Sequence, residues 1–267
     1  MTLRAYRTLI VEPLGEGDVV QVTLNRAERR NAIGPEMINE LRWAFTDAHE
    51  NKAIRVIVLT GAGKAFCAGG DFAQMTSSAD EGTLPLHEDG GGDYASLMLS
   101  MVNTKKPIVA KVNGHAMGGG LGLVAASTFA VAATTAQLGT PEVDVGLFPM
   151  MIMALLSRLV PRRKLVSMMV LGERLEAHQA EELGLVNAVA PPEELDQHVD
   201  ALCDRLRKKA PLAVAHGLAA LAAQDGQQLA DALPMLRERL GALLATDDAR
   251  EGLSAFLQKR APQWSGK

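Results

Sequence analysis

Short apolar runs rich in β-branched residues alternate with helical patterns over the first part of the chain. This alternation is typical of βα units built around a parallel or mixed sheet, so it predicts an α/β fold. The strands are expected at residues 7–11, 19–24, 55–59, 108–112, 128–132 and 185–189.

The first helix is expected to begin at Pro35 and to run to about residue 50. Proline is well tolerated at the first helical position, because it loses no intrahelical hydrogen bond there. The polar, glycine-rich stretch 74–94 lacks either periodicity and predicts a long mobile loop. The apolar positions of the expected helix fall on one face, which comprises Met37, Leu41, Ala44, Phe45 and Ala48.

Helical patterns replace strands after about residue 191 and continue to residue 256. Breaks are expected at Pro211, Gly226 and Gly241. The sequence therefore predicts a core at residues 1–191 and a C-terminal helical segment at residues 192–267. Alanine-rich helices of this kind bury an apolar face on their own core or on another subunit.

Composition excludes several classes of protein. The 267 residues are 48% hydrophobic with a net charge of −4, which supports a globular core and gives no basic surplus for nucleic acid. No apolar stretch approaches the ~20 residues that span a bilayer, and the N-terminal apolar run is too short for a signal peptide, so we expect a cytoplasmic protein. Cys67 and Cys203 stand far apart and are expected to be free thiols.

Two glycine-rich segments each follow an expected strand. One comprises residues 64–71 (KAFCAGGD) and the other residues 117–123 (MGGGLGL), which opens a helical run. Small residues let backbone N–H groups reach a ligand, and free amides at a helix N-terminus carry partial positive charge. Two such amides that face a shared crevice would form an oxyanion hole, which stabilises negative charge on a carbonyl or thioester oxygen.

The runs VIVLTGAGKAFCAGGDF, KPIVAKVNGHAMGGGLGL and QLGTPEVDVGLFP, in this order and spacing, resemble the enoyl-CoA hydratase/isomerase (crotonase) family. The resemblance extends over about residues 19–267 and implies a ββα spiral core with a C-terminal helical subdomain, assembled as a homotrimer or homohexamer. It implies an acyl-CoA thioester as substrate, with coenzyme A as part of that substrate and no other cofactor or metal. The implied oxyanion-hole amides are Gly70 and Gly119. The implied coenzyme A contacts are Lys64, Ala65, Ala68 and Asp71, with Phe256 and Lys259 reaching a neighbouring subunit's ligand.

Hydratases of that family carry two glutamates, and this chain matches only the second. Gly122 stands at the first position, where we expect it to line the site and to leave a gap, and Glu142 stands at the second. Reversible hydration of a 2-enoyl-CoA is the leading prediction, because hydratase-like members with this glycine exist. Isomerisation of a 3-enoyl-CoA by one glutamate is an alternative, and a non-catalytic acyl-CoA binding protein is another. Met150 replaces an aspartate of the dienoyl-CoA isomerases and hydroxyisobutyryl-CoA hydrolases, which disfavours both activities.

Other polar residues near these motifs have simpler interpretations. Asp71 is as well explained by a turn or cap as by catalysis, and His115 by packing or by support of the site. Both remain the next candidates for a base after Glu142. The histidines of the chain show no metal-binding spacing.

Overall fold

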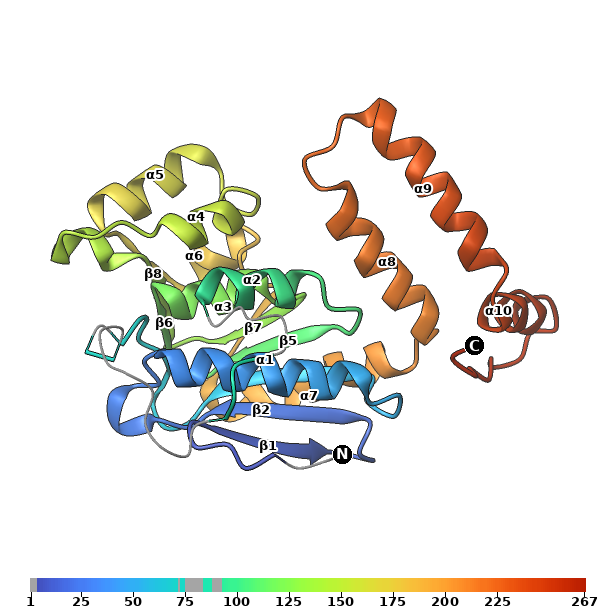
Figure 1. The fold of residues 1–267 in the computed structure, drawn as a ribbon, viewed down its shortest axis with the longest axis horizontal. Helices are drawn as coiled ribbons and strands as arrows, with labels where there is room; N and C mark the ends of the chain where they lie inside the picture. The colour runs from blue at the N-terminus through green and yellow to red at the C-terminus, as the bar shows by residue number, and fades with distance from the viewer. Residues whose placement is uncertain (1–3, 72, 75–83, 88–92) are drawn as a thin grey trace.

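The computed structural model describes residues 4–71, 73–74, 84–87 and 93–267. Most of the loop predicted at residues 74–94 lies outside these ranges. The larger sheet has the strand order β1-β2-β3-β5-β7-β10, in which β1 is antiparallel to β2 and the remaining neighbours are parallel (Figure 1). Its strands are β1 (Leu9–Leu14), β2 (Val19–Leu24), β3 (Val56–Gly61), β5 (Ile108–Val112), β7 (Phe129–Ala133) and β10 (Ala188–Ala190).

A smaller sheet lies beside the first and has the order β4-β6-β8-β9. Each of β3, β5 and β7 in the large sheet is followed along the chain by a short strand of the small sheet. The chain therefore winds as a spiral from one sheet to the other and back, which confirms the predicted α/β spiral. The strands of the small sheet are β4 (Ala65–Cys67), β6 (His115–Met117), β8 (Gln137–Gly139) and β9 (Arg174–Glu176).

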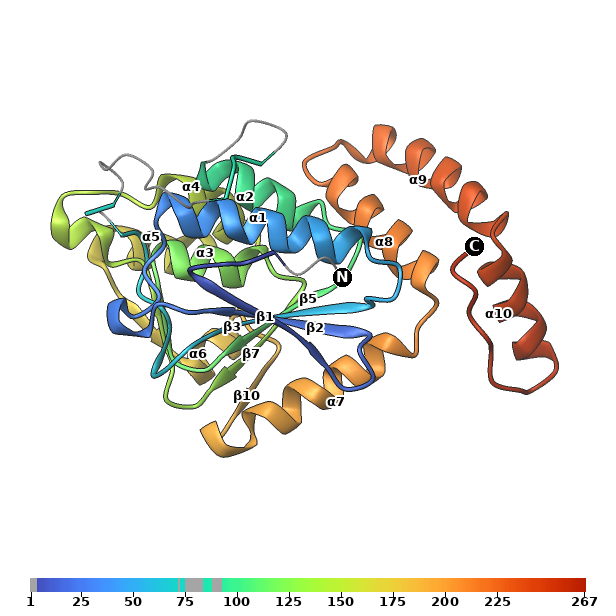
Figure 2. The ribbon, with the colours of Figure 1, turned by 60° about the horizontal axis from the view of Figure 1, so that its bottom comes forward.

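Helices cover both faces of the large sheet (Figure 2). On one face lie α1 (Pro35–Glu50), α2 (Tyr94–Val102) and α3 (Gly119–Ala126), whose apolar side chains join the larger hydrophobic core. Helix α7 (Leu195–Arg207) covers the other face, where its apolar side chains pack against valines of the sheet. All the positions predicted to form the buried face of α1 are buried.

The segment after β8 closes over the start of α3. It begins with the 3₁₀ turn η2 (Pro141–Val145) and continues through α4 (Met150–Leu156), α5 (Arg162–Leu171) and α6 (Ala177–Glu182). Helix α4 packs against α3, and α5 packs against η2. Because of these contacts, residues 141–156 face the glycine-rich start of α3.

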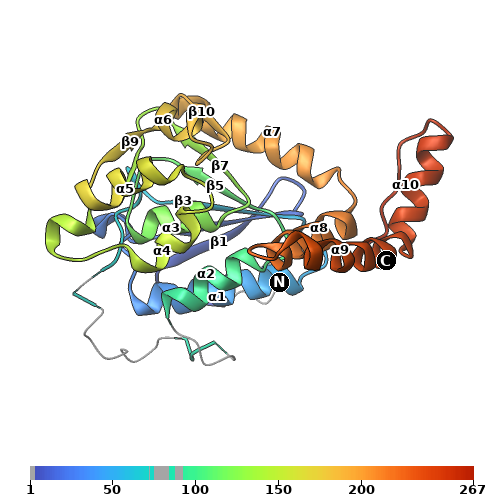
Figure 3. The same ribbon diagram turned by 90° about the horizontal axis from the view of Figure 1, so that it is seen from above.

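The last three helices project away from the two sheets (Figures 1 and 3). They are α8 (Pro211–Gln224), α9 (Leu229–Leu244) and α10 (Asp247–Leu257). Helix α8 buries none of its described residues, and α9 buries only Ala232. Their exposed large apolar side chains are Leu221, Leu229, Leu233, Leu240, Leu244, Leu253, Phe256 and Leu257.

Helix α7 belongs physically with the core rather than with these projecting helices. Leu195, Val199 and Cys203 are buried against the large sheet. Helix α7 therefore packs with the sheet, while the domain boundary at residue 191 stays a prediction. A helical pattern alone does not show whether its apolar face packs against the sheet. The sequence pattern therefore assigned α7 to the C-terminal helical segment.

The sequence predicted the long elements better than the short ones. The bounds of β2, β5 and α1 agree with the prediction, and the other large-sheet strands agree approximately. The three-residue strands of the small sheet were not predicted, because so few residues show no periodicity. Gly241 lies inside α9, so the break expected there is wrong. Cys67 and Cys203 are free, as expected, and both are buried.

Candidate active site

The two glycine-rich segments meet because β4 and β6 are parallel neighbours in the small sheet. Gly69 has φ = +104°, and a Cβ atom there would lie 3.1 Å from the Met117 carbonyl oxygen. The backbone thus requires glycine at this point of close approach. Asn31 supports the same region, since its side-chain amide donates to the carbonyl oxygens of Ala65 and Phe66 at 2.9 and 3.2 Å.

Two backbone N–H groups at these strand ends are available to a ligand. Ile33 forms a parallel bridge with Gly70, donating to the Gly69 oxygen and accepting from the Asp71 N–H. In this parallel bridge Ile33 bonds to the two neighbours of Gly70 and not to Gly70 itself. The N–H of Gly70 therefore points away from Ile33. Gly119 is the first residue of α3, where an N–H has no intrahelical acceptor.

Glu142 lies directly beside the start of α3. It is held on η2, whose first residue is Pro141. Gly118 precedes α3 with φ = +49°, and a Cβ atom at this position would lie 2.7 Å from Glu142 Oε1. A side chain at position 118 would therefore displace the carboxylate. The structure thus brings the predicted base next to the peptide that presents the Gly119 N–H.

The surroundings of Glu142 do little to stabilise the negative charge of its carboxylate. Its Oε2 atom is buried and, among the described residues, has no hydrogen-bond partner. Burial raises the pKa of Glu142 above the ordinary glutamate value of 4.5, because desolvation disfavours the charged form. A hydrogen bond from the Glu142 backbone opposes this shift without cancelling it. A desolvated carboxylate with one unpartnered oxygen atom can exchange a proton with a bound ligand.

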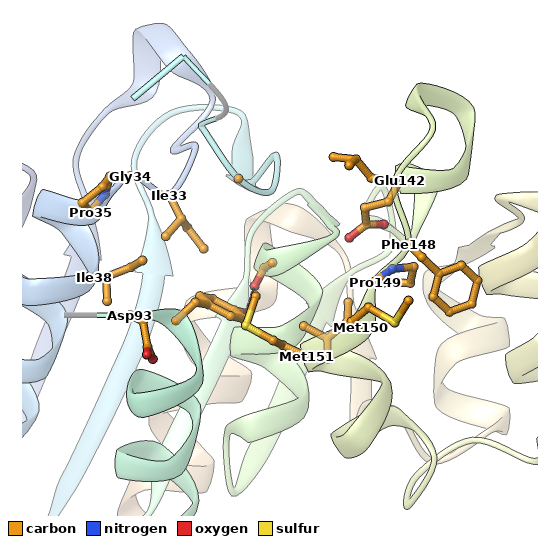
Figure 4. A pocket seen from close by; sticks show the side chains of 15 residues that line it. Ile33, Gly34, Pro35, Ile38, Asp93, Glu142, Phe148, Pro149, Met150 and Met151 are labelled. Carbon is orange, nitrogen blue, oxygen red and sulfur yellow. Dashed lines mark hydrogen bonds between the residues drawn. The ribbon is translucent and has the colours of Figure 1, made fainter. Parts of the chain in front are cut away.

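A cavity of about 550 Å³ joins these groups. Its walls are largely apolar, and Glu142 projects into it from one side while Ile33 and Ile38 face it from the other (Figure 4). The cavity can therefore hold an apolar chain whose polar end lies at the strand ends. It is lined by Ile33, Gly34, Pro35, Ile38, Gly70, Asp93, Tyr94, Gly119, Glu142, Leu147, Phe148, Pro149, Met150, Met151 and Ile152.

The gap expected beside Gly122 does not exist. A Cβ atom at position 122 would lie 2.2 Å from the Tyr94 hydroxyl oxygen and 2.4 Å from Ile152 Cγ2. Gly122 is buried in α3 and does not line the cavity. The prediction failed because Tyr94 lies far from Gly122 in the sequence, and its packing against α3 could not be inferred from local sequence.

Asp71 is held by two arginines rather than directed into the cavity. Its Oδ2 accepts from Arg26 at 2.9 Å and from Arg29 at 3.2 Å. Burial pushes the pKa of Asp71 upward, but the hydrogen bond and charge of Arg26, together with Arg29, outweigh it and lower the pKa. The side chain therefore joins the end of β4 to the segment after β2. This arrangement favours the structural interpretation of Asp71 over the catalytic one.

The remaining predicted residues lie outside the cavity. Lys64 and Ala68 are exposed and Ala65 is half-buried, all beside β4. His115 is exposed, and its Nδ1 accepts from the Gln137 N–H at 3.0 Å. Phe256 is 82% exposed near the end of α10, which lies far from α3 and α4 in Figure 1 and is followed closely by Lys259.

Sequence reasoning missed the aromatic floor of the cavity, which is Tyr94. Its hydroxyl donates to the Gly119 carbonyl oxygen.

Nowhere in the residues that the structure describes do three or more His, Cys, Asp or Glu side chains gather as a metal ion would require. In the same ranges no helix combines the length and apolar character needed to cross a membrane.

Known proteins resemble this chain in both sequence and fold. The family model for enoyl-CoA hydratase/isomerase matches residues 15–267. The Rattus norvegicus protein named enoyl-CoA hydratase domain-containing protein 3, mitochondrial, is 32% identical over 244 residues, which are 91% of this chain and 80% of that protein.

Two solved structures match over nearly the full length. The enoyl-CoA hydratase of Mycobacterium smegmatis has a TM-score of 0.88 and 34% identity, covering 97% of this chain and 99% of that one. The enoyl-CoA hydratase of Bacillus anthracis has a TM-score of 0.87 and 28% identity, covering 98% of this chain and 100% of that one. The chain therefore belongs to the enoyl-CoA hydratase/isomerase family, as its motifs predicted.

Proposed function

We propose that this protein binds an enoyl-CoA thioester and moves one proton on it with Glu142 as the single acid and base. The observation that carries the proposal is the position of a desolvated carboxylate, with one unpartnered oxygen atom, beside the N–H of Gly119 at the start of α3. The reaction that this arrangement supports best is conversion of a 3-enoyl-CoA to a 2-enoyl-CoA. That reaction removes a proton from one carbon and returns it to another, so one base suffices.

In the proposed mechanism the thioester oxygen accepts hydrogen bonds from the N–H groups of Gly70 and Gly119. These donors stabilise the enolate that forms when the ionised Glu142 takes a proton from the carbon next to the thioester. Glu142 then returns the proton to the γ-carbon, which relocates the double bond and regenerates the carboxylate. The apolar cavity walls exclude water from the acyl chain during this exchange.

Hydration of a 2-enoyl-CoA is the second candidate, and the names of the relatives favour it. Water addition needs a water molecule held and deprotonated while a proton reaches the α-carbon. Among the described cavity residues the carboxylates are Asp93, which is exposed, and Glu142, which has a buried oxygen atom without a partner. One group would have to perform both tasks, and this is why we place isomerisation first.

A panel of 2-enoyl and 3-enoyl CoA esters tests the proposal. Incubation in deuterium oxide should introduce deuterium at the α- or γ-carbon, and product mass separates the two reactions, because hydration adds one water and isomerisation adds none. We expect exchange together with isomerisation of the 3-enoyl ester. Tight binding without any exchange would instead identify a non-catalytic acyl-CoA binding protein.

We further propose that coenzyme A lies along β4, at Lys64, Ala65 and Ala68, with Asp71 holding the adjoining turn. Lys64 and Ala68 are exposed, which leaves them accessible to a ligand. Isothermal calorimetry should then give far tighter binding for a thioester than for its free acid. Equal affinities would remove the basis for coenzyme A recognition at this edge.

We also propose that α8–α10 assemble the protein into a homotrimer or homohexamer. The support is the large apolar side chains, mostly leucines, that these helices leave exposed, since extended exposed apolar surface marks interaction sites. In such an assembly Phe256 and Lys259 would approach a neighbour's ligand. Light scattering at micromolar concentration should give a trimeric or hexameric mass, and a monomeric mass would contradict the proposal. The cytoplasmic location stays a prediction.

A further inference from the structure

The volume beside Gly122 is filled from two sides. The Tyr94 hydroxyl belongs to the start of α2, and Ile152 Cγ2 belongs to α4. A Cβ atom added at position 122 would lie closer to each of these atoms than real Cβ atoms approach their neighbours. Tyr94 is 9% exposed and Ile152 is 3% exposed, so both side chains are buried. The two residues also line the cavity that contains Glu142. Together they form a plug between α3 and the cavity.

The polar end of this plug, the Tyr94 hydroxyl, already has a hydrogen-bond acceptor. The Tyr94 hydroxyl donates to the carbonyl oxygen of Gly119. Burial, followed by the nearby Cys67 and Glu142, raises the pKa of Tyr94 well above its ordinary value of 10.0. The phenol therefore stays neutral over the working pH range and serves as a hydrogen-bond donor rather than as a base. Its bond holds the first turn of α3, where the Gly119 N–H begins the helix.

The other carboxylate of the cavity is also engaged. Asp93 Oδ1 accepts from the Ser96 N–H at 2.7 Å and thereby caps α2. Its carboxylate points away from Glu142 on the opposite wall in Figure 4. Among the described residues that line the cavity, no second acidic group is directed toward Glu142. A water molecule on the Tyr94 side of the carboxylate would meet an aromatic ring and an aliphatic side chain.

We propose that Tyr94 is a specificity-determining and positioning residue that, with Ile152, excludes the water needed for hydration and thereby directs Glu142 toward proton transfer within the acyl chain. The inference rests on the proposed function, because it presupposes that Glu142 exchanges a proton with an enoyl-CoA. The ring of Tyr94 sets the reaction outcome, and its hydroxyl sets the position of the Gly119 peptide. These two contributions can be separated by mutation.

The experiment measures a partition ratio, which is the rate of water addition to a 2-enoyl-CoA divided by the rate of isomerisation of the 3-enoyl-CoA. Tyr94→Phe keeps the ring and removes only the hydrogen bond. We expect this variant to keep the wild-type ratio while kcat for isomerisation falls by about 2- to 10-fold, the effect of one lost hydrogen bond, with little change in KM.

Variants that open the plug should change the ratio itself. Tyr94→Ala removes the ring, and Ile152→Ala opens the same volume from α4 while leaving the Tyr94 hydroxyl in place. We expect each to raise the ratio of hydration to isomerisation by roughly tenfold or more, since the vacated volume leaves room for a water molecule beside the bound acyl chain. Circular dichroism monitors folding, and Ile152→Ala provides the test if Tyr94→Ala fails to fold. Leu99→Ala, on the exposed side of α2, is the matched control and should leave the ratio unchanged.

Deuterium exchange separates failure of this inference from failure of the proposed function. If the wild-type protein exchanges no α- or γ-proton, the proposed function is wrong and the inference falls with it. If the wild-type protein exchanges protons but a folded plug-opening variant keeps the wild-type ratio, only the role of Tyr94 is overturned. An altered ratio in Tyr94→Phe would also overturn it, because the ring would then not be the determinant.

Discussion

Glycines at the start of α3 and glycines in the projecting helices α8 and α9 occupy opposite environments. Cβ atoms at positions 118, 120 and 122 would lie within 2.7, 2.5 and 2.2 Å of other atoms. Gly217 in α8 and Gly241 in α9 would bring a Cβ atom into open space, with nothing within 4 Å. Glycine is thus required for close packing at the start of α3, whereas in α8 and α9 the chain itself leaves room for a larger residue.

This difference shows where the chain concentrates its chemistry. The start of α3 combines close backbone approach, a free helix N-terminus and a desolvated carboxylate, and each of these needs a small residue beside it. The projecting helices carry exposed leucines and no comparable constraint. Substitutions at the start of α3 should therefore affect catalysis and packing strongly, whereas Gly217 and Gly241 should accept a methyl group wherever no subunit covers them.

The largest effect is expected from Glu142→Gln, which keeps the size of the side chain and removes the proton acceptor. Turnover should fall by about 10²- to 10⁴-fold, the usual range for a general base, while binding changes little. Steady-state kinetics on the productive thioester, with Glu182→Gln on the exposed surface of α6 as control, measure this. Full activity of Glu142→Gln would mean that the base lies elsewhere, with Asp71 and His115 examined next.

Much of this region could be predicted from sequence. Gly70, Gly119 and Glu142 belong to contiguous motifs whose spacing is fixed along the chain, and the structure places all three on one cavity. Tyr94 could not be found in the same way. Its role arises because α2 packs against α3, and a tertiary contact of this kind leaves no local pattern in the sequence.

Gly119→Pro is expected to have the second largest effect. Proline is tolerated at the first position of a helix, so the variant removes the N–H donor without breaking α3. Loss of one oxyanion donor should lower kcat by about 10²- to 10³-fold. Gly119→Ala is the matched control, because its Cβ atom would meet its nearest neighbours at 3.5 and 3.6 Å and the N–H remains. Equal kcat in the two variants would show that this amide does not bind the oxyanion.

The pH dependence of turnover should report the desolvation of Glu142. Catalysis requires the ionised base, and burial raises its pKa above 4.5, so activity should decline on the acid side at a higher pH than for an exposed glutamate. Below that pKa the rate should fall by about tenfold per pH unit. A profile of kcat against pH measures the position of the decline. An acid limb at or below pH 4.5 would contradict the assigned environment.

The same shift makes Glu142 a source of instability. Its pKa is higher in the folded protein than in the unfolded chain, so the folded state loses stability as pH rises through this interval and Glu142 ionises. Glu142→Gln should therefore not lower the melting temperature at neutral pH, even though it removes activity. Thermal unfolding of the inactive variant checks that its loss of turnover is chemical.

Gly122→Ala should destabilise the protein by roughly 1–3 kcal/mol, because its Cβ atom would overlap the Tyr94 hydroxyl and Ile152. Gly122→Glu should be worse, and it should not create a hydratase unless the plug is opened first. Urea unfolding monitored by circular dichroism measures the change. Gly122→Ala in the Tyr94→Ala background should recover part of the loss, and an absence of recovery would show that Tyr94 is not the obstacle.

The smallest effect, and one of opposite sign, is expected from Gly217→Ala. This glycine lies inside α8, is exposed, and would bring its new methyl group into open space. Alanine restricts the unfolded chain and favours the helix, so the substitution should stabilise α8 by roughly 0.5–1 kcal/mol where no neighbour covers it. Thermal unfolding should therefore show a slightly raised melting temperature, in contrast to Gly122→Ala. A destabilised Gly217→Ala would instead place this face against another subunit in the assembly, because a methyl group would then meet atoms that a single chain does not supply.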